Sequence, residues 1–252
     1  MSDTIYAAHR GYSSIAPENS IPAFEEAVKH GFGAVECDVW QAREDGGGPQ
    51  LMIMHDENLS RMCGVNVRIT KLTKSELAEY PIIRGKNIGK YGGSLPIPTF
   101  EDYLQILETT EAIPIVEIKS REPENEENAI SEETARHLTS LLYNKLPGRL
   151  AVLQSFNLHS LYRLKPFIRK NTQLLYLVKK PALIKSERLL EYKKAGIAGI
   201  SAKYTILSST SISRIHKCGC KLAVWTVDSR ALARKLAAAD HVEYVISNKI
   251  YK

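Results

Sequence analysis

Long hydrophobic runs are missing from this 252-residue sequence, since none approaches the roughly 20 consecutive apolar residues that span a membrane. The N-terminal residues lack the charged and apolar regions of a secretory signal. Cysteine is scarce too: the four cysteines include no C-x-x-C pair, so neither a disulfide framework nor a cysteine zinc site is indicated. We therefore expect a cytoplasmic protein with reduced thiols and no transmembrane segment.

Motifs of RNA and DNA binding are also missing, as is the Gly-x-Gly-x-x-Gly turn of dinucleotide-binding folds. The net charge of +6 suits an anionic partner, but lysine and arginine are spread along the chain rather than clustered. We expect no nucleic-acid partner. With 44% hydrophobic and 25% charged residues, the chain can form one large globular domain, and its oligomeric state is not indicated.

Apolar segments of strand length alternate with helical segments along most of the chain. The predicted strands are Ile5–His9, 35–39, Ile113–Ile118, Leu150–Gln154, Gln173–Val178, Ile197–Ser201, Leu222–Val227 and Tyr244–Ile246. The predicted helices are Ser20–His30, Thr99–Thr109, Asn128–Asn144, Leu158–Ile168, Ser186–Ala195, Ser209–Lys217 and Ser229–Ala239. This α/β alternation predicts a (β/α)8 TIM barrel. A doubly wound open sheet is the alternative, but it has no glycine-rich turn to support it.

Two segments depart from the alternation. Residues 41–50 form a reversal before the apolar run Leu51–Met54, and the gap is too short for a helical crossover, so we predict a hairpin-like excursion. Residues 57–98, with a small helix near Thr73–Glu79, are longer than a connector. We therefore predict a single barrel domain, 1–252, that carries an insertion subdomain at about 57–98.

Carboxylates follow the predicted strands in a suggestive pattern. Glu36 and Asp38 share one face of their strand because side chains two residues apart point the same way, and so do Glu117 and Lys119. Burying neighbouring carboxylates is costly unless a cation compensates. At the carboxyl ends of barrel strands, Glu36, Asp38 and Glu117 would form an oxygen-rich site for one divalent cation, Mg²⁺ or Ca²⁺. The alternative is a set of polar strand ends without a ligand.

Two histidines are placed to reach the same mouth. His9 ends the first predicted strand, and His55 ends the excursion that starts beside the carboxylates. Such a pair could deprotonate a nucleophile and protonate a leaving oxygen, although each ring could also be structural. Arg10 and Lys119 fit beside a metal if an anion such as phosphate bridges them to it. Asp56 could orient the His55 ring or cap the next turn.

In chain order, these residues resemble the motifs of the glycerophosphodiester phosphodiesterase family. The matching segments are His9-Arg10-Gly11, Pro17-Glu18-Asn19-Ser20, Glu36-x-Asp38, His55-Asp56, Glu117-x-Lys119, Gln154-Ser155-Phe156 and Trp225-Thr226-Val227. The resemblance covers nearly the whole chain and implies a TIM barrel with a small insertion after the His-Asp motif. This chain has Asp228 where the family usually has Asn, and Ser247-Asn248 where it usually has Thr-Asp.

The resemblance also implies roles for the candidate residues. They are catalysis for His9 and His55, metal binding for Glu36, Asp38 and Glu117, and phosphate contact for Arg10 and Lys119. The implied reaction hydrolyses a small-molecule glycerophosphodiester to glycerol 3-phosphate and an alcohol, with a cyclic phosphate formed if the neighbouring glycerol hydroxyl attacks first. We expect Gln154 and Trp225 to contact the substrate, with Trp225 either stacking on glycerol or lining the barrel mouth.

Two other functions stay open on the sequence alone. The same chemistry on lysophospholipids would need an apolar groove beside the mouth. A non-catalytic phosphate-binding barrel would not need a pair of histidines. The acidic run 122–127 leaves a further choice between a solvated helix start and a lid that selects cationic head groups.

Overall fold

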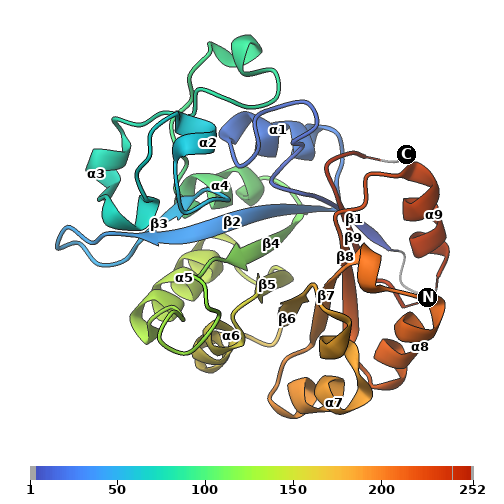
Figure 1. The fold of residues 1–252 in the computed structure, drawn as a ribbon. Helices are drawn as coiled ribbons and strands as arrows, with labels where there is room; N and C mark the ends of the chain where they lie inside the picture. The colour runs from blue at the N-terminus through green and yellow to red at the C-terminus, as the bar shows by residue number, and fades with distance from the viewer. Residues whose placement is uncertain (1–3, 240, 251–252) are drawn as a thin grey trace.

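The computed structural model describes residues 4–239 and 241–250 and contains a closed barrel of parallel strands (Figure 1). The barrel strands are β1 (Ile5–Ala8), β2 (Ala34–Ala42), β4 (Ile113–Ile118), β5 (Ala151–Ser155), β6 (Thr172–Val178), β7 (Gly199–Lys203), β8 (Lys221–Trp225) and β9 (Tyr244–Ser247). The sheet closes because β1 pairs in parallel with both β2 and β9. The predicted (β/α)8 barrel is confirmed, and the open-sheet alternative is wrong.

Helices surround the barrel or lie in the segment that follows β3 (Gln50–Ile53). They are α1 (Ile21–Lys29), α2 (Ser60–Cys63), α3 (Lys74–Leu77), α4 (Phe100–Glu108), α5 (Glu132–Lys145), α6 (Leu158–Leu164), α7 (Ser186–Lys194), α8 (Ser209–Lys217) and α9 (Arg230–Ala238). Local sequence fixes several starts. Ser20 accepts a backbone hydrogen bond at the start of α1, and Thr99 forms a capping box with Asp102 in α4.

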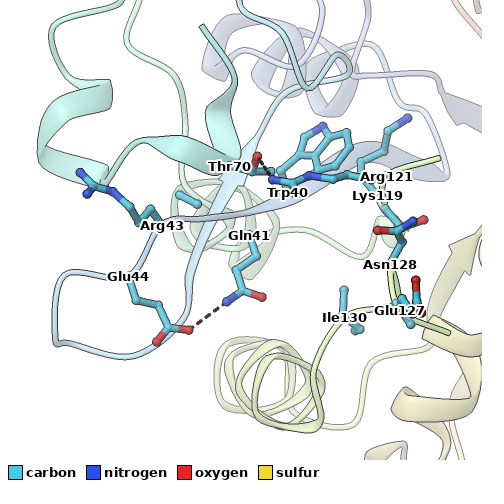
Figure 2. A pocket seen from close by; sticks show the side chains of 13 residues that line it. Trp40, Gln41, Arg43, Glu44, Thr70, Lys119, Arg121, Glu127, Asn128 and Ile130 are labelled. Atoms are coloured by element: carbon cyan, nitrogen blue, oxygen red, sulfur yellow. Dashed lines mark hydrogen bonds between the residues drawn. The ribbon is translucent and has the colours of Figure 1, made fainter. Parts of the chain in front are cut away.

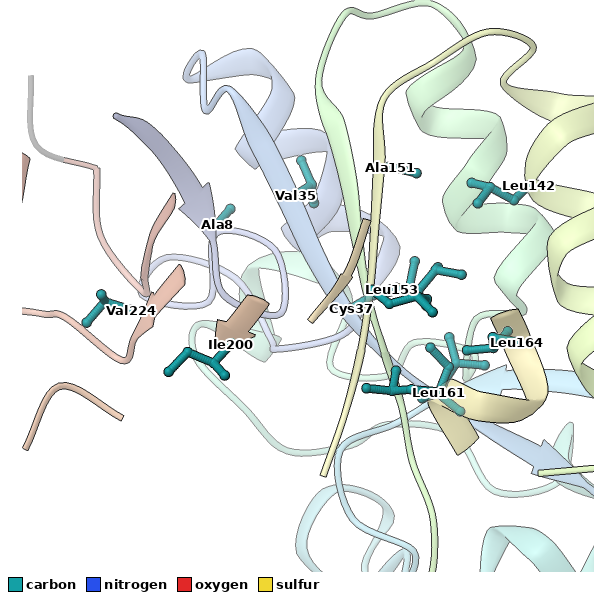
Figure 3. Close-up of a cluster of buried hydrophobic side chains, with 14 of the residues drawn as sticks. Ala8, Val35, Cys37, Leu142, Ala151, Leu153, Leu161, Leu164, Ile200 and Val224 are labelled. Atoms are coloured by element: carbon teal, nitrogen blue, oxygen red, sulfur yellow. The ribbon is translucent and has the colours of Figure 1, made fainter. Parts of the chain in front are cut away.

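The core has two layers, one inside the barrel and one between the strands and the helices. Small residues such as Ala7, Ala34 and Ala223 leave room inside the barrel for larger apolar side chains from neighbouring strands. Outside the strands, residues such as Cys37 and Leu161 pack in the second layer (Figure 3). Because both faces of the strands are covered, their sequences are mostly apolar rather than alternating. The polar exceptions include Glu36 and Asp38 on β2, and Glu117 and Gln154 toward the carboxyl ends of β4 and β5.

The β2–β3 hairpin carries a separate apolar cluster. β3 runs antiparallel to β2, as the predicted excursion requires, and extends away from the barrel in Figure 1. Trp40 and Met52 on this hairpin pack with Leu59, Ile69 and other buried side chains of the following segment. This cluster is consistent with an insertion subdomain, and the boundaries of about 57–98 remain our proposal.

Some predicted boundaries are wrong by a few residues. α5 begins at Glu132 instead of Asn128, because Ser131 supplies the N-cap and the Asn128 side chain donates to a loop carbonyl. The acidic run 122–127 therefore lies in a loop and is not a helix start. α6 ends at Leu164 and continues as a short 3₁₀ helix containing Pro166, because proline lacks the N–H that an α-helix needs there.

The cysteines and the helix lengths bear on the predictions of reduced thiols and of no transmembrane segment. All four cysteines are free thiols, as predicted. Within residues 4–239 and 241–250, no helix has both the length and the apolar character needed to cross a bilayer. The cytoplasmic location stays a prediction.

Tyr103 links α4 to the barrel and offers a test of the fold. Its hydroxyl donates to the Val35 carbonyl in β2 at 2.7 Å, and its buried ring packs on Phe24 and Phe100. Tyr103→Phe should lower the free energy of unfolding by about 1–2 kcal/mol, because a buried carbonyl loses its donor. The measurement is chemical denaturation. The control Tyr162→Phe, at a 38% exposed residue, should change stability by less than about 0.5 kcal/mol. Equal losses would contradict the assignment.

Candidate active site

A pocket of about 310 Å³ lies at the carboxyl ends of the barrel strands. It is lined by His9, Arg10, Glu36, His55, Glu117, Gln154, Phe156, Leu177, Lys179, Lys203, Trp225, Thr226 and Ile246. The remaining two sequence-predicted residues lie next to it: Asp38 is buried against Arg10 and Lys119, and Lys119 lines an adjoining pocket. The barrel therefore brings together every residue that the sequence singled out for the site.

Three carboxylates form the floor of this site. One oxygen from each of Glu36, Asp38 and Glu117 lies within 4.8 Å of the others, and the residues are 1%, 1% and 8% exposed. Their proximity follows from the sheet, because Asp38 on β2 is the register partner of Glu117 on β4. Glu36 lies two residues earlier on the same face of β2.

Donors surround these carboxylates. The Arg10 backbone N–H donates to Glu36 at 2.8 Å, and its Nε lies 3.4 Å from Asp38. Lys119 Nζ lies 2.7 Å from Glu117 and 3.4 Å from Asp38. Fully buried Asn19 donates its side-chain amide to Asp38 at 2.7 Å. Asp38 is therefore the most strongly satisfied carboxylate of the three.

The pKa values separate the three acids. Burial and the neighbouring carboxylates raise the pKa of Glu36 well above its usual value. Burial also raises the pKa of Glu117, to about 7, although Lys119 opposes the shift. For Asp38, burial acts upward but Lys119 and Arg10 prevail and hold the pKa well below its usual range. The cluster thus keeps one firmly ionised carboxylate beside two whose ionisation is resisted.

The His9 ring lies beside this cluster and is held by a side chain from the other end of the chain. Its Nδ1 is 2.8 Å from Asn248 Oδ1. Burial and the positive charge of Arg10 lower the pKa of His9 to about 4, so the ring is neutral near pH 7. A neutral imidazole can accept a proton through its free nitrogen.

The His55 ring is held differently. Its Nδ1 is 2.6 Å from the Asp56 carboxylate, which also accepts from Arg61 Nε at 2.5 Å. Arg61 in turn contacts Glu18, which accepts from Arg10. These contacts support the prediction that Asp56 orients the His55 ring, rather than the alternative that it caps the next turn. Burial lowers the pKa of His55, while Asp38 and Asp56 act in the opposite direction.

The β2–β3 hairpin brings His55 to the mouth of the barrel. The Met54 backbone N–H donates to the Asp38 carbonyl at 3.0 Å, and Trp40 Nε1 donates to the His55 carbonyl at 3.3 Å. Both contacts tie the end of β3 to β2, the strand that carries the acids. The hairpin therefore sets the position of His55 relative to the carboxylates.

Apolar side chains also line the pocket, among them Phe156, Leu177, Trp225 and Ile246, together with Lys179 and Lys203. Trp225 donates its indole N–H to the Ser201 carbonyl at 3.0 Å, and its ring meets Phe156 edge-on with centroids 5.7 Å apart. Gln154 is 2% exposed and lines the pocket, yet its Oε1 has no hydrogen-bond partner. A buried amide oxygen without a donor is costly, and a ligand hydroxyl could satisfy it.

Two further pockets adjoin the site on the side of Lys119. One, of about 240 Å³, shares His55, Glu117 and Lys179 with the first pocket and is also lined by Lys119, Glu122 and Glu124. Lys179 lies 3.6 and 3.9 Å from these acids. The other, of about 480 Å³, runs outward between the β2–β3 hairpin and the loop after β4 (Figure 2). Gln41, Thr70 and Arg121 line it, and Lys119 joins it to the site.

Several supporting residues were not identified from the sequence. Glu18 and Asn19 belong to a quoted motif, but their contacts with Arg10 and Asp38 depend on how the loop folds back over the mouth. Asn248 lies far along the chain from the His9 ring that it contacts, and Arg61 links nearby Asp56 to Glu18, which lies 43 residues earlier. For Asn248, the sequence offered one signal, its departure from the family pattern that the resemblance implies.

Comparison with known proteins identifies the family. The model of the "Glycerophosphoryl diester phosphodiesterase family" matches residues 9–251. The glycerophosphodiester phosphodiesterase of Bacillus subtilis (strain 168) is 27% identical over 241 residues, which cover 91% of this chain and 78% of that protein. A human lysophospholipase D is 39% identical over 75 residues, 30% of this chain and 23% of that protein.

A solved structure agrees with these matches. A phosphodiesterase of Oleispira antarctica, determined in complex with the product sn-glycerol-3-phosphate, superimposes with a TM-score of 0.81. It is 25% identical in sequence, and the match covers 98% of this chain and 93% of that one. Given the family match along nearly the whole chain, the protein belongs to the glycerophosphoryl diester phosphodiesterase family and is a phosphodiesterase of that family.

Proposed function

We propose that this phosphodiesterase is metal-dependent and hydrolyses glycerophosphodiesters to glycerol 3-phosphate and an alcohol, with His9 and His55 as acid–base pair. The observation that carries the proposal is the convergence of three buried carboxylates and two histidines on one pocket. The related enzyme in complex with sn-glycerol-3-phosphate supports the choice of product. The substrate would be a small molecule.

The charges of the site fit a divalent cation. Glu36, Asp38 and Glu117 offer buried carboxylate oxygens close enough to share one ion, and such oxygens suit Mg²⁺ or Ca²⁺. Arg10 and Lys119 contact these acids directly and supply two positive charges, and Lys179 and Lys203 also line the pocket. A divalent ion together with these cations would give the site a net positive charge, which suits a phosphodiester anion. When bound, the ion would withdraw charge from the phosphoryl oxygens.

Arg10 and Lys119 are the proposed phosphate contacts. Arg10 lines the pocket, and its guanidinium lies 3.4 Å from Asp38 through Nε and 2.8 Å from Glu18 through Nη1, which holds its positive charge at the mouth. The Lys119 ammonium stays charged because Glu117 and Asp38 raise its pKa against the effect of burial. Both side chains would bind and orient the phosphate.

The two histidines are the proposed proton carriers. One ring would take the proton of the attacking hydroxyl as the new P–O bond forms, and the other would protonate the alcohol oxygen as its P–O bond breaks. If the neighbouring glycerol hydroxyl attacks, a cyclic phosphate forms, and water opens it in the second half of the reaction. The adjoining pockets meet at His55 and Glu117, which gives separate space to the two halves of a diester.

Hydrolysis of lysophospholipids is the second candidate. It is favoured by the short match to human lysophospholipase D and by the apolar side chains of Phe156, Leu177, Trp225 and Ile246 that line the pocket. Assays of glycerophosphocholine beside lysophosphatidylcholine of increasing acyl length separate the two. Preference for the acylated substrates would replace the first proposal with the second.

Alanine at either histidine should abolish turnover without disturbing the fold. We expect His9→Ala and His55→Ala each to lower kcat for glycerophosphocholine by about 10²–10⁴-fold, because each removes one proton carrier. Melting temperature and the affinity for Mg²⁺ or Ca²⁺ should stay near the wild-type values. The assay follows release of glycerol 3-phosphate.

The control for these variants is His137→Ala, on α5 outside the site. It should retain wild-type kcat. Full activity in both site variants would overturn the acid–base assignment, and loss of cation affinity would instead indicate damage to the metal site.

Glu36→Gln should stabilise the cation-free protein at pH 8. The pKa of Glu36 is higher in the folded protein than its value of about 4.5 in the unfolded chain. Above about pH 4.5 the unfolded chain therefore loses this proton more readily than the folded protein, and the folded state becomes less stable as pH rises. The melting temperature in EDTA should therefore exceed that of the wild type by several degrees, at about 2–4 °C per kcal/mol. The gain should shrink toward pH 5, and the exposed control Glu79→Gln should show none.

Added Mg²⁺ or Ca²⁺ should reverse the order, since the wild type gains more stability from the ion. A variant that melts below the wild type in EDTA at pH 8 would contradict the account of the acidic cluster.

A further inference from the structure

A chain of three side chains leads away from the His9 ring. His9 Nδ1 lies 2.8 Å from Asn248 Oδ1, and Asn248 Nδ2 lies 2.7 Å from Asp228 Oδ2. Asp228 also accepts from the Ser247 hydroxyl at 3.1 Å and from the Asn248 backbone N–H at 2.9 Å, both on Oδ1. Asp228 lies between β8 and α9, and Asn248 directly follows β9.

Elementary donor and acceptor rules fix the protons along this chain. An ionised carboxylate can only accept, so the Asn248 NH₂ group has to face Asp228. The Asn248 carbonyl oxygen then has to face His9, and an oxygen of this kind can only accept. His9 must therefore carry its hydrogen on Nδ1. In the neutral ring, this leaves the lone pair on Nε2.

We propose that Asn248, oriented by Asp228, is a positioning residue that holds His9 in the tautomer with its hydrogen on Nδ1 and Nε2 free to accept a proton. The inference deepens the proposed function and rests on it for its catalytic consequence, which makes His9 the base that deprotonates the nucleophile. Neither Asn248 nor Asp228 lines the pocket, so both would act through His9.

His55 provides a contrast within the same site. Its Nδ1 contacts the Asp56 carboxylate directly at 2.6 Å, whereas His9 contacts a neutral amide with the carboxylate one residue further away. A carboxylate in direct contact stabilises a protonated ring more than an amide does. The contact with Asp56 therefore suits His55 as the general acid, and the contact with Asn248 suits His9 as the general base.

The geometry also accounts for two departures from the family pattern. Asp228 and Asn248 are the positions at which this chain has Asp and Asn where the family usually has Asn and Asp. Because the two side chains contact each other, the departures amount to one exchange. If position 228 carried Asn, its Oδ1 could still accept from the Ser247 hydroxyl and from the backbone N–H of residue 248. Its NH₂ group would then face an Asp carboxylate at position 248.

The exchange suggests a set of variants with distinct outcomes. In Asp228→Asn alone, the new NH₂ group faces that of Asn248, so the Asn248 amide should flip and present its own NH₂ to His9. This forces the hydrogen of His9 onto Nε2. In Asn248→Asp alone, two carboxylates meet at the present 2.7 Å contact. The double variant Asp228→Asn/Asn248→Asp restores a complete set of donors and acceptors.

The expected kinetics follow from these arrangements. Each single variant should lower kcat for glycerophosphocholine at least about tenfold, with KM within about twofold of the wild type. The double variant should recover to within about threefold of the wild type. Asn144→Asp, an exposed amide on α5, is the control for an added carboxylate and should not change kcat.

The tautomer itself is measured by ¹⁵N NMR of the histidine rings, with His9 assigned from its loss in His9→Ala. Wild-type His9 at pH 7 should show a protonated Nδ1 and an unprotonated Nε2, and Asp228→Asn should reverse this. The His55 signals should stay unchanged, because its partner Asp56 is untouched. This measurement needs neither activity nor a bound metal.

Two results would overturn the inference. One is a His9 tautomer that is protonated on Nε2 in the wild type or unchanged in Asp228→Asn. The other is a double variant no more active than the single variants. If the wild type has no phosphodiesterase activity toward these substrates, the proposed function fails, while the NMR result still upholds or refutes the positioning of His9.

Discussion

The mutual repulsion of three buried carboxylates is the constraint around which the mouth of this barrel is organised. Glu36, Asp38 and Glu117 are brought together by the parallel register of β2 and β4, in a location where water cannot screen them. Charge must be supplied from elsewhere. Arg10 and Lys119 supply part of it, and the three carboxylate oxygens lie close enough together to hold one divalent ion as well.

The segments outside the regular barrel serve this site. The loop after β1 folds back to place Arg10 and Asn19 on the acids, and the β2–β3 hairpin carries His55 to their edge. The last strand ends beside the first, so Asn248 reaches His9 across the closure of the barrel. Residues at both ends of the described chain thus meet at one ring, and the closure of the barrel brings them together.

Much of this arrangement could be predicted because it depends on periodicity. Two-residue spacing placed Glu36 with Asp38, and the polar strand ends indicated the active mouth. The supporting contacts could not be predicted in the same way. The Arg61–Asp56–His55 contacts and the Asn248 amide depend on side-chain directions in loops and in the short helix α2, and no spacing rule encodes these directions. Helix limits such as Glu132 shifted for a similar reason, since a capping serine overrode the apolar pattern.

We propose that Glu36, Asp38 and Glu117 bind a divalent cation that hydrolysis requires. The most direct test of this proposal is the rate of glycerol 3-phosphate release from glycerophosphocholine, measured before EDTA, in excess EDTA, and after addition of Mg²⁺ or Ca²⁺ above the chelator. We expect the rate to fall at least about 100-fold in EDTA, because charge withdrawal from the phosphoryl oxygens is lost, and to recover with one or both ions. Undiminished release in excess EDTA would contradict the proposal.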